Sequence, residues 1–402
     1  MSGPCSYDRP RRIRRGAALT LFLTGVLAAG AATGTWDDAA DVAEPAARSR
    51  PADGTVADRA SVGWAARAAR AAAQAAADGK SGAQAADDVV SRSGDRWSTV
   101  YTPGEFEDFQ AQLGGTYVGV GLWVRQQEGG RITVSRVQPG GPAARAGIAV
   151  GDRLDAVDGS PAQGRPVTET VARLRGDGPE GSGAAAGTPV RLDLRRAARQ
   201  WSVTLHRTRL HTQNVTVDRP VGADGPTRIK ITAFAKGTGT AVRRAVRTAD
   251  PREGLLLDLR GNTGGLVGEA VATASVFLDG GLVATYDVHG SQRALYAAGT
   301  GDTRTPLVVL VDGGTMSAAE LLSGALQDRG RAVVVGSPTF GKGSIQMPSE
   351  LPDGSVAELT VGHYRTPAGR AVDGAGITPD LIVEDHAEKR ARTVLSGLGT
   401  GT

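Results

Sequence analysis

Between residues 254 and 343 the sequence repeats one plan: a continuous apolar run, a Gly-rich turn and a helix-prone segment. The plan occurs in GLLLDLRGNTGGLVGEAVATASVFL, again in LVVLVDGGTMSAAELLSGALQ, and begins once more in AVVVGSPTFGKG. Apolar runs without alternation are typical of strands whose two faces are both buried. The sequence therefore predicts an α/β core in which helices cover a sheet.

The N-terminus has the pattern of an export signal. Basic residues 9–15 (RPRRIRR) precede an apolar run that extends to about Gly34, and Ala29–Ala31 forms an A-x-A-like cleavage site. The run is also nearly long enough to span a bilayer, so a cleaved signal and a retained single-span anchor over residues 1–35 both stay open. Residues 36–58 lack hydrophobic periodicity and are predicted to form a disordered linker. Residues 59–105 are predicted to form a helical segment.

Composition excludes several classes of function. The net charge is only +4 over 402 residues, and much of it lies in RPRRIRR, so nucleic-acid binding is not expected. The single cysteine, Cys5, allows no intramolecular disulfide. No His, Cys or Asp cluster has the spacing of metal ligands, and no phosphate-binding Gly motif occurs at a strand–helix junction. We therefore expect neither a metal nor a cofactor.

Residues 106–207 have the pattern of a separate module with alternating strands, one short helix and a hairpin. This module resembles a PDZ domain. The residues that carry the resemblance are Gly119-Val120-Gly121-Leu122 and the run PAARAGIAVGDRL from Pro142 to Leu154. Consecutive N–H groups at Gly119–Leu122 would form a cradle for a peptide's terminal carboxylate, and a free strand edge would add the peptide as a further strand. The loop Gly176–Gly187 is longer than the family pattern.

The stretch Val308–Gln346 contains the candidate chemistry. Ser317 lies where a strand and a Gly-rich turn lead into a helix, which is a position that exposes a nucleophile. No histidine lies in a motif-like setting, so the candidate base is Lys342. A lysine acts as a base near pH 7 only if burial lowers its pKa from the ordinary ~10.4 by several units. The plain alternative is that Ser317 caps a helix and Lys342 is solvated.

Further groups near this pair would complete an acyl-transfer site. The N–H of Ala318 and the turn Gly264-Gly265 are the candidate donors to an oxyanion. Gln346 could orient the Lys342 side chain, although the spacing is equally compatible with a surface glutamine. Structural roles are favoured for Asp258 and Glu320.

Taken together, the motifs resemble those of the carboxy-terminal processing peptidases, also called tail-specific proteases. The resemblance covers about residues 60–385 and is carried by SGDRWSTVYTPGEFEDF, DLRGNTGG, GGTMSAAE, GALQDRGRAVVVGSPTFGKGSIQ, LPDGSVAELTV and TPAGRAVDGAGITPD. It implies a serine endopeptidase that uses Ser317 as the nucleophile, Lys342 as the general base and Gln346 to orient the lysine. It also implies an oxyanion hole formed by Gly264, Gly265 and Ala318. Thr263 and Thr315-Met316 depart mildly from the family's usual residues.

The expected architecture is α/β within a multidomain α+β chain. A helical N-terminal segment and a β-barrel-like PDZ domain precede a crotonase/ClpP-like catalytic core over residues 208–390, and residues 391–402 form a flexible tail. The expected partners are protein substrates with apolar C-terminal tails in the cell envelope or outside the cell. Single-span membrane association stays open, and the sequence does not indicate an oligomeric state. A non-catalytic, tail-binding scaffold with the same fold is the alternative, and the PDZ domain could either gate the site or deliver substrate to it.

Overall fold

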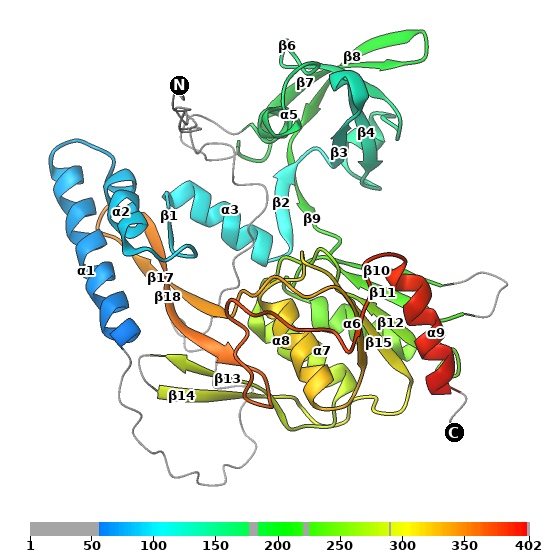
Figure 1. The fold of residues 1–402 in the computed structure, drawn as a ribbon. Coiled ribbons are helices and arrows are strands. Elements are labelled where there is room, and N and C mark those ends of the chain that lie inside the picture. The colour runs from blue at the N-terminus through cyan, green and yellow to red at the C-terminus, as the bar shows by residue number, and fades with distance from the viewer. Residues whose placement is uncertain (1–55, 177–183, 220–224, 289–290, 400–402) are drawn as a thin grey trace, which may run out of the picture. The chain divides into compact units, whose positions relative to one another are not determined.

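The computed structural model describes residues 56–176, 184–219, 225–288 and 291–399 (Figure 1). Among these residues, one compact unit spans Val118–Arg209, and the second comprises residues 56–117 and 210–399. The predicted export segment and nearly all of the predicted linker lie outside the described residues. Within the described part of the chain, no helix combines the length and the apolar character that crossing a membrane requires.

The smaller unit is built on a six-stranded sheet in the order β3-β4-β5-β7-β8, with β6 paired to β5. Its apolar core includes Ile132, Leu154 and Leu192, and it is closed by two short helices. The elements are β3 (Leu122–Gln126), η4 (Glu128–Gly130), β4 (Ile132–Val137), α4 (Pro142–Arg145), β5 (Arg153–Val157), β6 (Ser160–Pro161), α5 (Val167–Arg175), β7 (Pro189–Arg196) and β8 (Arg199–His206). The chain enters this unit through β2 (Thr116–Gly119) and leaves it through β9 (Thr208–His211).

Residues 106–117 belong to the larger unit, whereas the sequence prediction began the PDZ domain at residue 106. They form most of α3 (Pro103–Leu113), whose Phe109 and Leu113 pack with Phe106 and Leu266. This apolar contact, made within the larger unit, is the physical reason for the later start of the PDZ unit at Val118.

The larger unit is organised around a second six-stranded sheet, in the order β10-β11-β12-β15-β16-β19. Only the β10–β11 pair is antiparallel, and the other neighbours are parallel. Every residue of β12 and of β15 is buried, as the continuous apolar runs predict. The strands are β10 (Val215–Asp218), β11 (Thr227–Ile231), β12 (Leu255–Asp258), β15 (Leu307–Val311), β16 (Val333–Gly336) and β19 (Leu381–Ile382).

Helices cover both faces of this sheet (Figure 1). The face that contains Leu257 and Val309 packs against three helices, α6 (Thr238–Arg247), α7 (Val267–Phe277) and α8 (Ala318–Asp328). The opposite face, with Leu256 and Val308, packs against α9 (Ala387–Gly399). Because neighbouring residues of a strand point to opposite faces, a buried strand has to be apolar throughout.

The flexible tail predicted from residue 391 is wrong for residues 391–399, because these residues continue α9. Ala391 and Leu395 are buried against the sheet, at 0% and 3% exposure. The spacing of Ala387, Ala391, Val394 and Leu395 is that of one helical face, and this periodicity is the signal that could have predicted the helix.

An antiparallel sheet, in the order β1-β18-β13-β14 with β17 paired to β18, carries the N-terminal helices. Ala68 and Ala72 of the first helix pack on Leu359, so the helix lies close to the sheet through small side chains. The elements are α1 (Val56–Ala77), α2 (Gly82–Val90), η3 (Ser91–Ser93), β1 (Thr99–Tyr101), β13 (Leu282–Val288), β14 (Ser291–Tyr296), β17 (Ser344–Glu350) and β18 (Val356–Arg365).

Candidate active site

Ser317 lies in a strained turn between β15 and α8. Its backbone has φ +52° and ψ −117°, and its side chain is buried, at 2% exposure. A positive φ costs a non-glycine residue on the order of 1–3 kcal/mol, and such residues are concentrated at functional sites. Ser317 directly precedes Ala318, the first residue of α8, at the strand-to-helix turn that the sequence predicts.

One buried carboxylate joins the segments that carry Ser317 and Lys342. Glu320 is fully buried, and its Oε2 accepts the N–H groups of Ser317 at 2.8 Å and Lys342 at 2.9 Å. Its Oε1 accepts the Thr339 hydroxyl at 2.6 Å and the Gly341 N–H at 2.7 Å. Burial raises the pKa of Glu320, and the hydrogen bonds oppose that rise. Both carboxyl oxygens therefore accept main-chain N–H groups, from Ser317 and Lys342 on one and from Gly341 on the other.

A tyrosine joins the same two segments from the other side. The hydroxyl of Tyr364, on β18, lies 2.8 Å from the carbonyl oxygen of Ser317 and 3.0 Å from that of Lys342. Burial raises the pKa of this phenol well above its ordinary value, so it stays protonated and donates. Sequence reasoning did not identify Tyr364. Glu320 and Tyr364 together fix the main chain at Ser317 and Lys342 relative to each other.

Lys342 is fully buried, which the proposed chemistry requires. Among the described residues its Nζ has no hydrogen-bond partner, and it lies 4.9 Å from the centroid of the Trp97 ring. Burial lowers the pKa of Lys342 to about 8, against the opposing effect of the carboxylates of Glu358, Asp95 and Glu320. A lysine with such a pKa carries a useful fraction of neutral amine near neutral pH.

Gln346 is buried in β17, close to Lys342 in sequence but not bonded to it. Its Nε2 donates to the hydroxyls of Ser344 at 2.8 Å and Thr360 at 3.1 Å. Its Oε1 has no partner within the described part of the chain. Likewise, no hydrogen bond joins Ser317 Oγ and Lys342 Nζ among the described residues. Gln346 is fully buried, so the alternative of a surface glutamine is wrong. The predicted role of Gln346 in orienting Lys342 stays a prediction.

The Gly264-Gly265 turn lies directly against Ser317. A Cβ added at Gly264 would lie 2.9 Å from Ser317 Cβ, so only glycine allows this approach. Gly265 has φ +126°, and an added Cβ would lie 2.3 Å from a main-chain oxygen. The Gly264 N–H donates to Asn262 Oδ1 at 2.9 Å. That leaves the N–H groups of Gly265 and Ala318, which have no acceptor among the described residues, as the candidate oxyanion donors.

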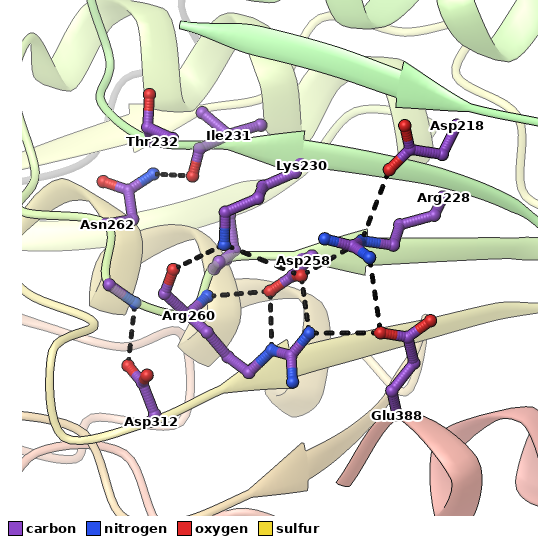
Figure 2. A network of polar contacts seen from close by, with 12 residues as sticks. Asp218, Arg228, Lys230, Ile231, Thr232, Asp258, Arg260, Asn262, Asp312 and Glu388 are labelled. Atoms are coloured by element: carbon purple, nitrogen blue, oxygen red, sulfur yellow. Dashed lines mark hydrogen bonds and ion pairs between the residues drawn. The ribbon is translucent and has the colours of Figure 1, made fainter. Parts of the chain in front are cut away.

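A buried ion network holds the strand that leads into this turn (Figure 2). Asp258, at the end of β12, is fully buried and forms ion pairs with Arg228 at 3.2 Å and with Arg260 at 2.7 Å. Both arginines also contact Glu388 of α9. Burial raises the pKa of Asp258, but hydrogen bonds from Arg260 and the charges of Lys230 and Arg260 hold it below its ordinary value. The structural role predicted for Asp258 agrees with this network. The outer members of the network, Arg228, Arg260 and Glu388, are partly exposed to solvent.

In the smaller unit, Gly119-Val120-Gly121-Leu122 forms the connection between β2 and β3. Gly121 has φ +75°, a conformation that favours glycine. The carbonyl groups of Val120 and Gly121 accept main-chain hydrogen bonds at 2.9 and 2.8 Å, whereas their N–H groups have no acceptor in the described residues. Free, adjacent N–H groups are what a carboxylate-binding loop needs.

Comparisons with known proteins agree with this fold. Residues 227–383, under half of the chain, match peptidase family S41, and residues 133–180 match the PDZ domain. Carboxyl-terminal-processing peptidase 2 of the chloroplast from Arabidopsis thaliana is 35% identical over 316 residues, which are 73% of this chain and 58% of that protein. Carboxy-terminal processing protease CtpA of Bacillus subtilis is 31% identical over 301 residues, 73% of this chain and 62% of that protein.

The solved structure of a photosystem II D1 C-terminal processing protease aligns with a TM-score of 0.47 and 28% identity, covering 80% of this chain and 86% of the other. The fold and the matches define a class of protein, a serine-peptidase core combined with a PDZ domain. Residues 227–383 belong to peptidase family S41, and over 73% of its length the chain is similar to the carboxyl-terminal processing peptidases. It spans about three fifths of the length of the curated relatives.

Proposed function

We propose that the chain is an exported serine endopeptidase that binds the C-terminal tails of proteins and cleaves near them with a Ser–Lys dyad. The observation that carries the proposal is the buried amine of Lys342, whose pKa is lowered to about 8 and whose main chain is joined to that of Ser317 by Glu320. A solvated lysine on the surface would have neither property.

In the proposed reaction these groups act in turn. Neutral Lys342 accepts the proton of Ser317 as the Ser317 oxygen attacks the peptide carbonyl carbon. The N–H groups of Gly265 and Ala318 stabilise the negative charge on the carbonyl oxygen. The Lys342 ammonium then protonates the leaving amine, which breaks the peptide C–N bond and leaves an acyl ester on Ser317. Water, deprotonated by the same lysine, hydrolyses that ester and regenerates the hydroxyl.

The test of the dyad is labelling and proteolysis with matched variants. The full-length protein should react with a fluorophosphonate and degrade a substrate that has an apolar C-terminal tail. Ser317→Ala should lose both activities, and Lys342→Ala should lose at least a hundredfold of each, because general base catalysis contributes about 10²–10⁴-fold. The exposed residues Ser396 and Lys236 provide the controls Ser396→Ala and Lys236→Ala. Unchanged activity in Ser317→Ala or Lys342→Ala would refute the assignment, and a folded but inactive wild type would favour the tail-binding scaffold.

The pH dependence of the reaction is a separate prediction. Only the neutral amine of Lys342 is a base, so kcat/KM should rise with pH and reach half of its plateau near the pKa of about 8. The rate of fluorophosphonate labelling, measured from pH 6 to pH 10, should follow the same curve. A flat profile, or one that falls as pH rises, would contradict Lys342 as the base.

For the PDZ unit we propose that Val120 and Gly121 bind the terminal carboxylate of the substrate tail. An amidated tail cannot present that charge to the free N–H groups, so it should compete at least tenfold less well than the same peptide with a free carboxylate. Equal competition by the two peptides would exclude carboxylate recognition. Cleavage accelerated by a free-carboxylate peptide in trans would favour gating by the PDZ unit, whereas simple inhibition would favour delivery.

A further inference from the structure

A short turn in the N-terminal segment contacts the candidate base. In this turn, Asp95 accepts the Trp97 N–H at 2.9 Å and the Ser98 hydroxyl at 2.5 Å. The Ser98 hydroxyl oxygen in turn accepts the N–H of Thr360, on β18, at 3.1 Å. Burial raises the pKa of Asp95, but hydrogen bonds from Ser98 and Thr360 outweigh it and hold the pKa below its ordinary value. The turn is therefore closed by an ionised carboxylate and fixed to the strand beside Gln346.

This turn places an indole ring over the Lys342 amine. Nζ lies 4.9 Å from the centroid of Trp97, within the range of a cation–π contact. The amine has no hydrogen-bond partner among the described residues, and the ring face is one of its close contacts. Phe340 packs against the same indole, with ring centroids 5.7 Å apart at 62°. The ring therefore has a fixed position against a buried ammonium.

Burial and the neighbouring charged groups have opposite effects on the protonation of Lys342. Burial lowers the pKa of Lys342, and Glu358 of β18, Asp95 of the turn and Glu320 of α8 raise it. The Arg96 guanidinium also lies over the indole, at 4.6 Å, and so competes for the same ring. The aromatic face favours the ammonium over the neutral amine, because only the cation is attracted by the ring's negative face.

We infer that Trp97 is a positioning residue for the base: its ring holds the Lys342 ammonium in the resting protein and favours the protonated state. The inference rests on the proposed function, in which Lys342 is the general base, but the contact can be measured without any catalytic activity. It adds the Asp95–Ser98 turn to the site, at a distance in sequence from both dyad residues.

The decisive experiment is a double-mutant cycle on the full-length protein, with Trp97→Leu, Lys342→Met and the double variant measured by urea denaturation at pH 7. Trp97→Leu should raise the unfolding equilibrium constant about 2- to 30-fold more in the wild-type background than in the Lys342→Met background, which is the range of a cation–π contact. At pH 10.5, where the amine is neutral, this difference should disappear. Trp64, whose ring lies under Arg67 at 4.6 Å, provides the control Trp64→Leu, which should behave identically in both backgrounds.

A second readout separates positioning from a merely structural role. Removing the ring should lower the half-maximal pH of fluorophosphonate labelling by about 0.4–1.5 units, and Trp97→Phe, which keeps a weaker aromatic face, should shift it less. Trp97→Phe also replaces Trp97→Leu in the cycle if the leucine variant does not fold. A cycle without coupling at pH 7 would overturn the inference, whether or not the protein is active. Coupling in a protein that shows no labelling would support the contact and overturn the proposed function instead.

Discussion

Replacing Lys342 by methionine should stabilise the protein at neutral pH. The Lys342 side chain is 0% exposed, and burial lowers its pKa from 10.5 to about 8. In the unfolded chain the lysine returns to its ordinary pKa, so between these two values the unfolded state binds more protons than the folded state. A pKa unit corresponds to 1.36 kcal/mol, so keeping the amine charged in the folded state at pH 7 costs about 3 kcal/mol.

The cost has a defined pH window. It is fully present below pH 8, decreases as the pH rises through the folded-state pKa, and is under about 0.5 kcal/mol at pH 10.5. The stability difference between Lys342→Met and wild type should therefore shrink by about 3 kcal/mol between pH 7 and pH 10.5. Other titrating groups are common to both proteins and cancel in the difference.

The assay is urea denaturation at 25 °C at several pH values. The free energy of unfolding of the unit that contains Lys342 is compared between Lys342→Met and wild type. Lys236→Met, at an exposed position, is the control and should show no such pH-dependent gap. A gap that is constant with pH, or a methionine variant that is less stable at pH 7, would refute the account of Lys342 as a buried base.

Further predictions concern the frame around the dyad. Glu320→Gln places an amide NH₂ against main-chain donors and should destabilise the protein by about 3 kcal/mol in urea denaturation, with loss of labelling. A destabilisation below about 1 kcal/mol would contradict this role. Gly265→Ala should abolish proteolysis, because the added Cβ would lie 2.3 Å from a main-chain oxygen, whereas Gly268→Ala, with open space around it, should be fully active. Leu395→Ala should lower the free energy of unfolding by about 2–4 kcal/mol, because it leaves a cavity under α9. Leu398→Ala, at a position 42% exposed, should lower it by less than about 1 kcal/mol. Similar losses for the two variants would argue against the observed packing of this helix.

The sequence was sufficient to predict the core and the place of Ser317 between a buried strand and a helix. The runs ending at Asp258 and Val311 are apolar at every strand position but the last residue of the first, and buried strands require such runs. After the first run, Gly264 and Gly265 form a turn with positive φ that favours glycine, and Ser317 follows the second run at a helix start. These are local patterns, so a single sequence contains them in full.

The groups that brace the site could not be predicted in the same way. Tyr364 and Trp97 reach Lys342 only because strand β18 and the N-terminal turn meet in space, and no local pattern marks either residue. Glu320 looks like an ordinary first-turn acid of a helix, which is a common position for a carboxylate. Its second set of donors comes from a loop that follows the next strand, so its bridging role is a property of the tertiary fold.

The bracing by Glu320 and Tyr364 has a consequence for how this fold can evolve. Both side chains bind the main chain of Ser317 and Lys342, through N–H groups on one side and carbonyl oxygens on the other. These four hydrogen bonds involve neither the Ser317 hydroxyl nor the Lys342 amine, so they do not depend on the identity of the two side chains. A descendant that lost the hydroxyl or the amine would keep these hydrogen bonds and the fold around them. Under the proposed mechanism, one substitution at Ser317 or Lys342 therefore separates an active peptidase from an inactive protein with the same fold.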